Sequence, residues 1–424
     1  MPTSRSWPDY VTYRDAIQAP KVCFTDPRLR AADIRKDDNG IPLAATGKSA
    51  IVFRANAGSK DVALRCFTRG TPAQRSRYQA LHAHIAPSSP PYFVDFTYRD
   101  REILVSGDRY PVVEMGWADG APLNIWVKDH LQRSGDLAGM AVTWLYVVND
   151  LRRRNMAHGD LANDNCLVSG SHLTLIDYDG CFIPALAAAD PGEAGNQHFQ
   201  HPQRMGYYAF NVDAFPSLVI YLSLRALSKD KTLWQFHNRE NLIFAAADYR
   251  SPRTTPIWKA LAKNRDPLVI SLTTALADMC DAPINALPPL SHLVTQASIP
   301  AQQQRPWWQT WPPPTYAQKA VRDTQGQEPW WRSATLLSQG TGSTPAGPKA
   351  VSTSRLKDQL RSGPQQGSHH RSQSRSPSLA QPPGRPRRKR RAAAVGLTVT
   401  VTIVAFLLLA IFIFFVAFIA ALSS

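Results

Sequence analysis

Three polar residues near the middle of the chain have the types and spacing that phosphoryl chemistry requires. Asp160 and Asn165 lie five residues apart, and Asp177 follows twelve residues later. The apolar runs 166–168 and 173–176 flank a Ser-Gly-Ser turn, which predicts a hairpin that brings the three residues to one point. Phosphoryl transfer needs one carboxylate at the acceptor hydroxyl, and a second carboxylate and an amide that hold Mg²⁺ on the phosphates.

These residues belong to a longer pattern. Residues 158–165, HGDLANDN, resemble the protein-kinase catalytic loop H-R-D-L-x-x-x-N, and residues 175–180, LIDYDG, resemble the strand leading into D-F-G. By this resemblance Asp160 is the catalytic base, Asn165 is a second catalytic-loop residue, and Asn165 and Asp177 are the Mg²⁺ ligands. The alternative is a hairpin whose Asp and Asn residues only form turns. Three such residues at these offsets between two apolar strands favour the site.

Further landmarks resemble a group of bacterial kinase-like proteins over about residues 7–290. They include Trp-Pro at 7–8, VALRCFTR at 62–69 and QHPQR at 200–204. The resemblance implies an α+β, two-lobed protein-kinase-like fold and ATP-dependent phosphorylation of Ser or Thr in a protein substrate. We expect residues 1–45 to form an N-terminal extension packed on the kinase domain. Residues 46–115 should form a β-rich small lobe, and residues 116–297 a large helical lobe.

Hydrophobic periodicity predicts the elements that position the site. Alternation of apolar residues predicts strands over 50–53, 62–67 and 110–115. Helical spacing predicts helices over 71–85, 136–155 and 212–227. By the resemblance, Asp213 at the start of the last helix braces the catalytic loop. A simple helix N-cap is the alternative for this residue.

Five positions are predicted to contact the nucleotide. By the resemblance, Gly47 begins a shortened glycine-rich hairpin over the phosphates, and a plain hairpin turn is the alternative. Arg65 stands where V-A-I-K has the phosphate-binding lysine. The segment MGWADGAPL resembles the kinase hinge, so Met115 would be the gatekeeper. The backbones of Gly116 and Ala118 would then contact adenine.

The chain departs from the kinase pattern in three respects. Arg65 replaces lysine, and residues 62–94 contain no Asp or Glu, so the usual partner carboxylate on the following helix is missing. We expect Arg65 to pair with Asp177 or with phosphate instead. Gly159 replaces the catalytic-loop arginine, and residues 180–206 contain no Ser, Thr or Tyr. We therefore predict that no activation-loop phosphorylation switch exists.

The sequence is compatible with three functions. Retention of the Asp and Asn residues that touch metal and acceptor favours a membrane-tethered Ser/Thr kinase that uses ATP and Mg²⁺. Arg65 without a helix carboxylate favours a pseudokinase, a nucleotide-binding signalling scaffold. A small-molecule phosphotransferase is the third reading, because that related fold also ends its metal strand in I-D-x-D.

Charge and cysteine content exclude other classes. Residues 298–424 contain sixteen Lys plus Arg and three Asp plus Glu, so only +3 of the net charge of +16 belongs to residues 1–297. The high pI therefore does not indicate a nucleic-acid-binding domain. The five cysteines are scattered and lack Cys-x-x-Cys spacing, which indicates neither disulfides nor a zinc site.

The C-terminal third predicts a tether. Residues 298–391 are rich in Pro, Gln and Ser and should be disordered, with two Pro-Trp-Trp triplets that could dock a partner or the kinase lobe. Residues 392–422 carry no charge, and 397–419 would span about 34 Å as a helix. A basic cluster at 385–391 precedes this run. We expect a single transmembrane anchor with the kinase domain cytoplasmic.

Overall fold

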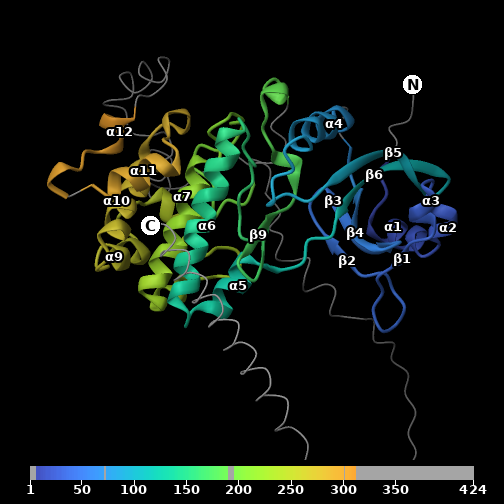
Figure 1. Cartoon of the computed structure of the whole chain (residues 1–424), viewed down its shortest axis with the longest axis horizontal. Coiled ribbons are helices and arrows are strands. Elements are labelled where there is room, and N and C mark those ends of the chain that lie inside the picture. Colours follow the sequence, from blue (N-terminus) through green and yellow to red (C-terminus); the bar gives the residue numbers. More distant parts are fainter. Residues whose placement is uncertain (1–5, 71–72, 190–194, 300, 312–424) are drawn as a thin grey trace, which may run out of the picture. The chain divides into compact units, whose positions relative to one another are not determined.

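The computed structural model describes residues 6–70, 73–189, 195–299 and 301–311. In this described part the chain is a mixed α+β protein, with a sheet region followed by a helical region (Figure 1). Six strands form an antiparallel sheet in the order β1-β3-β4-β6-β5, with β2 paired to β3. Their bounds are β1 (Asp33–Ile34), β2 (Ala44–Thr46), β3 (Ala50–Ala57), β4 (Lys60–Phe67), β5 (Phe96–Val105) and β6 (Asp108–Gly116). The strands predicted over 50–53, 62–67 and 110–115 are confirmed as parts of β3, β4 and β6.

Residues 6–46 are built into this sheet region. Helices α1 (Tyr10–Ile17), α2 (Pro20–Cys23) and α3 (Pro27–Arg30) lie beside the sheet (Figure 1). The Tyr13 side chain is buried, and its hydroxyl donates to the Phe67 carbonyl at 2.8 Å. Strands β1 and β2 pair with β3, so the sheet continues across the boundary predicted at residue 45.

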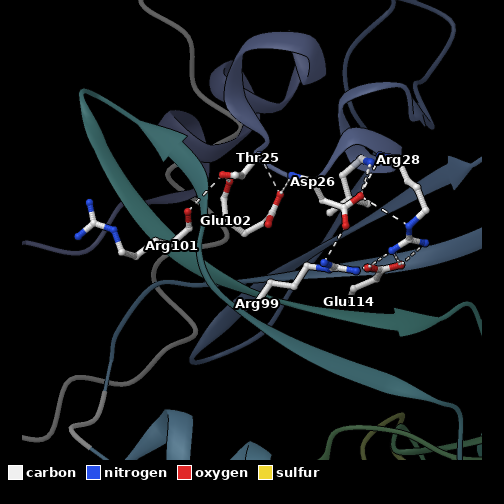
Figure 2. Close-up of polar contacts among 8 residues, drawn as sticks. Thr25, Asp26, Arg28, Arg99, Arg101, Glu102 and Glu114 are labelled. Atoms are coloured by element: carbon white, nitrogen blue, oxygen red, sulfur yellow. Dashed lines mark hydrogen bonds and ion pairs between the residues drawn. The ribbon is translucent and has the colours of Figure 1, made fainter.

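Charged residues fasten the α2–α3 segment to β5 and β6 (Figure 2). Glu102 Oε1 accepts hydrogen bonds from the amides of Thr25 and Asp26, at 2.8 and 2.7 Å. Asp26 pairs with Arg99 at 2.8 Å, and Glu114 pairs with Arg99 at 2.6 Å and with Arg28 at 3.1 Å. We call this set the clamp network; it consists of Asp26, Arg28, Arg99, Glu102 and Glu114.

The helical region packs around two long helices. Helix α4 (Gln74–Ile85) lies between β4 and β5 in the chain and packs on β5. The helical region contains β7 (Ala121–Pro122), α5 (Leu123–His130), α6 (Ser134–Arg153), β8 (Cys166–Ser169), β9 (His172–Leu175), α7 (Ala214–Lys229), α8 (Ala246–Arg250), α9 (Pro256–Leu261), α10 (Pro267–Asp281) and α11 (Leu290–Ala297). Short 3-10 helices are η1 (Tyr178–Gly180), η2 (Pro184–Leu186), η3 (Lys231–Phe236) and η4 (Ile284–Ala286). Trp144 on α6 is fully buried and donates to the Ser217 carbonyl of α7 at 2.9 Å. The three predicted helices are confirmed as α4, α6 and α7, with every end but that of α4 at Ile85 shifted by two or three residues.

Part of the predicted linker is folded. Residues 301–311 form η5 (Ala301–Gln303) and α12 (Trp307–Thr310), and Trp307 is only 6% exposed within the main hydrophobic cluster. Trp311 lies 5.3 Å from the His292 ring, between ring centroids. The boundary predicted at residue 297 therefore falls too early. Average composition there is polar, but burying these indole rings offsets the cost of ordering the short segment.

The remaining predictions for the C-terminal part concern residues that the structure does not describe. The second Pro-Trp-Trp triplet at 329–331, the basic cluster at 385–391 and the predicted span at 392–422 all lie outside the described residues. Across the described ranges, none of the helices combines the length and hydropathy needed to cross a bilayer.

Candidate functional site

The predicted hairpin forms and brings its flanking polar residues together. Strand β8 pairs with β9 in the register Cys166–Leu175 to Ser169–His172, so the chain before β8 meets the chain after β9. The Ile176 amide donates to the Asn165 carbonyl at 3.0 Å. Asn165 Nδ2 donates to the Asp160 carbonyl at 2.8 Å and to Asp160 Oδ2 at 3.0 Å. Asp160 and Asn165 are therefore in direct contact, and Asp177 follows the strand that closes the hairpin.

Asp213 supports the loop that carries Asp160. Its carboxylate accepts from the amides of His158 at 2.5 Å and Gly159 at 2.9 Å, and it makes no side-chain cap to its own helix. Asp213 therefore stands at the N-cap position of α7, but its carboxylate binds the loop and not the helix amides. Burial raises the pKa of Asp213, although hydrogen bonds from His158 and Gly159 oppose this shift. The Asp213 carboxyl group therefore fixes the backbone of the loop that carries Asp160.

Gly159 occupies a position that no other residue fits. Its φ is +78°, and a Cβ there would lie 2.0 Å from the Gly180 carbonyl oxygen. A buried cation nevertheless contacts this loop, because Arg204 Nη2 donates to the Gly159 carbonyl at 3.1 Å. Arg204 is 3% exposed and also donates to the Tyr207 carbonyl. Sequence reasoning used Arg204 only as a landmark, since it lies 45 residues from its partner.

Asp160 sits in a crowded, partly desolvated position. Its Oδ1 accepts from the Asn196 amide at 3.0 Å, and a Cβ on Gly195 would lie 2.5 Å from the same oxygen. Burial raises the pKa of Asp160, and the charges of Asp177 and Asp164 raise it further against the Asn196 hydrogen bond. A carboxylate in this state is suited to accept a proton.

Arg65 on β4 faces two carboxylates. Its Nη2 lies 3.2 Å from Asp177 Oδ1 and 2.5 Å from Asp179 Oδ2, and the residue is 7% exposed. The expected contact with Asp177 is present, but the closer partner is Asp179. The Tyr78 hydroxyl on α4 donates to Asp179 Oδ1. Sequence reasoning missed both Asp179 and Tyr78, although an aspartate where D-F-G has glycine was a signal.

The oxygen donors at the hairpin end fit Mg²⁺. Asp177 adopts a left-handed backbone with φ 65°, and its buried Oδ1 accepts no hydrogen bond from any described residue. Because Asn165 uses its Nδ2 on Asp160, its amide oxygen remains for a cation. Within the described ranges, no three His, Cys, Asp or Glu residues form a metal cage. Such a sparse protein ligand set is typical of Mg²⁺, which keeps water and substrate phosphates as further ligands.

The other residues predicted to contact nucleotide lie on or beside strands β2, β3 and β6. Gly47 lies in the β2–β3 turn, where its amide donates to the Ala50 carbonyl at 2.8 Å. Met115 is buried on β6 opposite Ala63 of β4. The Gly116 amide already donates to the Asp95 carbonyl at 2.9 Å, so it is not free to donate to adenine. Ala118 follows two residues later, and its amide has no hydrogen-bond partner in the described part of the chain.

Comparison of the chain with protein-family models and with curated proteins found no match. The kinase resemblance therefore depends on the motif residues quoted above and on how they are arranged.

Proposed function

We propose that this chain is an ATP-dependent protein kinase of the Ser/Thr type, with a two-lobed kinase-like fold. The observation that carries the proposal is the contact of Asp160 with Asn165 on a loop braced by Asp213, next to Asp177 and the buried Arg65. A base, two metal-ligand candidates and a phosphate-binding cation then lie within one group of residues. This combination meets the needs of phosphoryl transfer.

Each residue has a defined part in the proposed reaction. Asp160 orients the acceptor hydroxyl and takes its proton as the γ-phosphoryl group passes from ATP to that oxygen, which leaves ADP. Asn165 and Asp177 would hold Mg²⁺, which supplies positive charge to the phosphates. Arg65 would bind phosphate oxygens, and the backbone near Met115 and Ala118 would contact the adenine.

We also propose that the chain is anchored in a membrane by residues 392–422, with the kinase domain in the cytoplasm. The uncharged run and the basic residues that precede it support this topology. A protein substrate bearing Ser or Thr is the proposed partner, and the second Pro-Trp-Trp triplet is a candidate docking segment.

One observation favours a second candidate, a pseudokinase that binds nucleotide and serves as a scaffold. Arg65 is paired with two carboxylates, and it could hold Asp177 too tightly for metal to enter. In that case ATP would bind weakly or without Mg²⁺, and no phosphate would be transferred.

The test is transfer of labelled γ-phosphate from ATP to a generic Ser/Thr protein substrate by the full-length chain with Mg²⁺. The variants are Asp177→Asn, Arg65→Lys and, as a matched control, Asp230→Asn, whose carboxylate caps the Thr232 amide on η3. A kinase loses transfer with Asp177→Asn and keeps it with Asp230→Asn. Absence of transfer by the parent, with ATP still raising the melting temperature, would favour the pseudokinase. Arg65→Lys shows whether arginine limits the rate.

A further inference from the structure

Arg65 is shared unequally between two carboxylates of the Asp177–Asp179 segment. Its Nη2 donates a hydrogen bond to Asp179 Oδ2 at 2.5 Å. Asp177 Oδ1 is an ion-pair neighbour at 3.2 Å but accepts no hydrogen bond from a described residue. Asp179 is therefore the principal counter-charge of Arg65, and Asp177 is only its neighbour.

Asp179 is itself fixed by helix α4. The Tyr78 hydroxyl donates to Asp179 Oδ1, and Arg77 Nη1 donates to the Asp179 carbonyl at 3.2 Å. Tyr78 is 2% exposed and its ring stacks on Tyr98 at 5.8 Å between centroids. On the opposite side, the Ser49 hydroxyl lies 3.5 Å from Asp179 Oδ2. The carboxylate consequently has little freedom to turn away from Arg65.

The charge balance gives this arrangement a consequence for the metal. A guanidinium as deeply buried as that of Arg65 needs an anionic partner. If Asp179 were neutral, the carboxylate next in reach would be Asp177 at 3.2 Å. Full pairing of Arg65 with Asp177 would neutralise the oxygens that a divalent cation must bind.

We propose that Asp179 is a positioning residue, anchored to α4 by Tyr78, that holds Arg65 away from Asp177 and so leaves Asp177 open to Mg²⁺. The inference rests on the proposed function in that it assumes a divalent cation at Asp177. In this arrangement Asp179 serves as the carboxylate partner of Arg65, because α4 has no acidic residue to do so. Movement of α4 would then alter metal affinity through Tyr78.

The test measures metal affinity separately from turnover. Mn²⁺ binding to the full-length chain without nucleotide is followed by electron paramagnetic resonance, with ATP turnover recorded on the same samples. Asp179→Asn should weaken Mn²⁺ binding by roughly tenfold or more, because Arg65 moves onto Asp177. Removing the competing cation as well, in Arg65→Gln/Asp179→Asn, should restore Mn²⁺ affinity to at least the parent value. A residue that only stabilised the fold would not show this restoration.

Two further variants guard against misfolding and general loosening of α4. Tyr78→Phe removes one hydroxyl and should weaken Mn²⁺ binding in the same direction by a smaller factor, about threefold. Asp100→Asn is the matched control, because it breaks an exposed ion pair between β5 and Arg75 of α4 at 3.1 Å. It should leave Mn²⁺ affinity unchanged.

The outcomes separate this inference from the proposed function. Parent-like Mn²⁺ affinity in Asp179→Asn, or no restoration in the double variant, overturns the role of Asp179. A parent chain that binds Mn²⁺ but transfers no phosphate overturns the kinase, and the metal data still decide the role of Asp179. A parent chain that binds no Mn²⁺ without nucleotide overturns the role of Asp179, and the kinase proposal is then decided by phosphate transfer alone.

Discussion

Two groups of charged residues in this molecule are built in opposite ways. In the clamp network, Asp26 and Glu114 each pair with arginines, and Glu102 accepts from two backbone amides (Figure 2). At the candidate site, Asp177 and Asp179 pair with Arg65, and the charge of Asp177 acts on two further carboxyl groups. We call Asp160, Asp164, Asp177 and Asp179 the site carboxylates.

The pKa of one carboxyl group in the clamp is lowered, whereas the pKa values of two at the site are raised. Burial alone would raise the pKa of Asp26, but amide hydrogen bonds and Arg99 lower it overall. Burial and neighbouring carboxylates raise the pKa of Asp160 and of Asp164. Each carboxylate of the clamp is therefore compensated by an arginine or by backbone amides, whereas the site carries a larger surplus of negative charge. A surplus of this kind is costly without a cation and is typical of functional sites.

Loss of the Asp160 carboxylate should have the largest effect. Asp160→Asn keeps the shape but cannot take a proton, so phosphate transfer should fall by about 10²–10⁴-fold. The measurement is the turnover number at saturating ATP and Mg²⁺. Asp26→Asn in the clamp is the comparison and should change turnover little. Equal losses in both would remove the functional distinction between the two groups.

Loss of the Asp213 brace should have the next largest effect. Asp213→Asn replaces one of the two acceptor oxygens that hold the His158 and Gly159 amides, so the loop carrying Asp160 loses its fixed position. Turnover should fall by about 10²-fold, with a smaller change in the Michaelis constant for ATP. A parent-like turnover number would show that the loop is held by Arg204 alone.

Weakening the clamp should affect stability rather than activity. Glu102→Gln leaves an uncharged acceptor for the Thr25 and Asp26 amides, so the free energy of unfolding should fall by about 1 kcal/mol. Urea unfolding measures this change, and turnover below the transition should match the parent. Altered turnover in the folded variant would mean that the clamp communicates with the site.

The smallest effect is a difference in pH dependence. Because the pKa of Asp26 is lowered on folding, its contribution stabilises the protein at neutral pH and is lost as pH falls below about 4. Because the pKa of Asp160 is raised on folding, its ionised form destabilises the fold at neutral pH, and the penalty fades as pH falls towards about 4. At pH 7, Asp26→Asn should therefore lower the melting temperature and Asp160→Asn should raise it. Shifts of the same sign would contradict the contrast.

The sequence predicts what depends on local spacing. The hairpin that joins Asn165 to Asp177 and the helix that buries Trp144 follow from short-range periodicity. It does not predict partners brought together by tertiary packing. Arg65 meets Asp179, more than a hundred residues away, and Arg204 meets Gly159 across the fold.

The sequence-based predictions were least accurate at the two ends of the described fold. Averaging over 298–391 hid Trp307, whose burial orders its neighbours. Treating residues 1–45 as an extension missed β1 and β2, which are too short to give a periodic signal but complete the sheet through backbone hydrogen bonds.

The claim that the site carboxylates bind Mg²⁺ is tested most directly by calorimetric titration of the full-length chain with ATP, once with Mg²⁺ and once with EDTA. We predict that Mg²⁺ tightens ATP binding in the parent and that Asp177→Asn abolishes this gain, while Glu114→Gln in the clamp preserves it. ATP affinity that is the same with and without Mg²⁺ in the parent would contradict this claim.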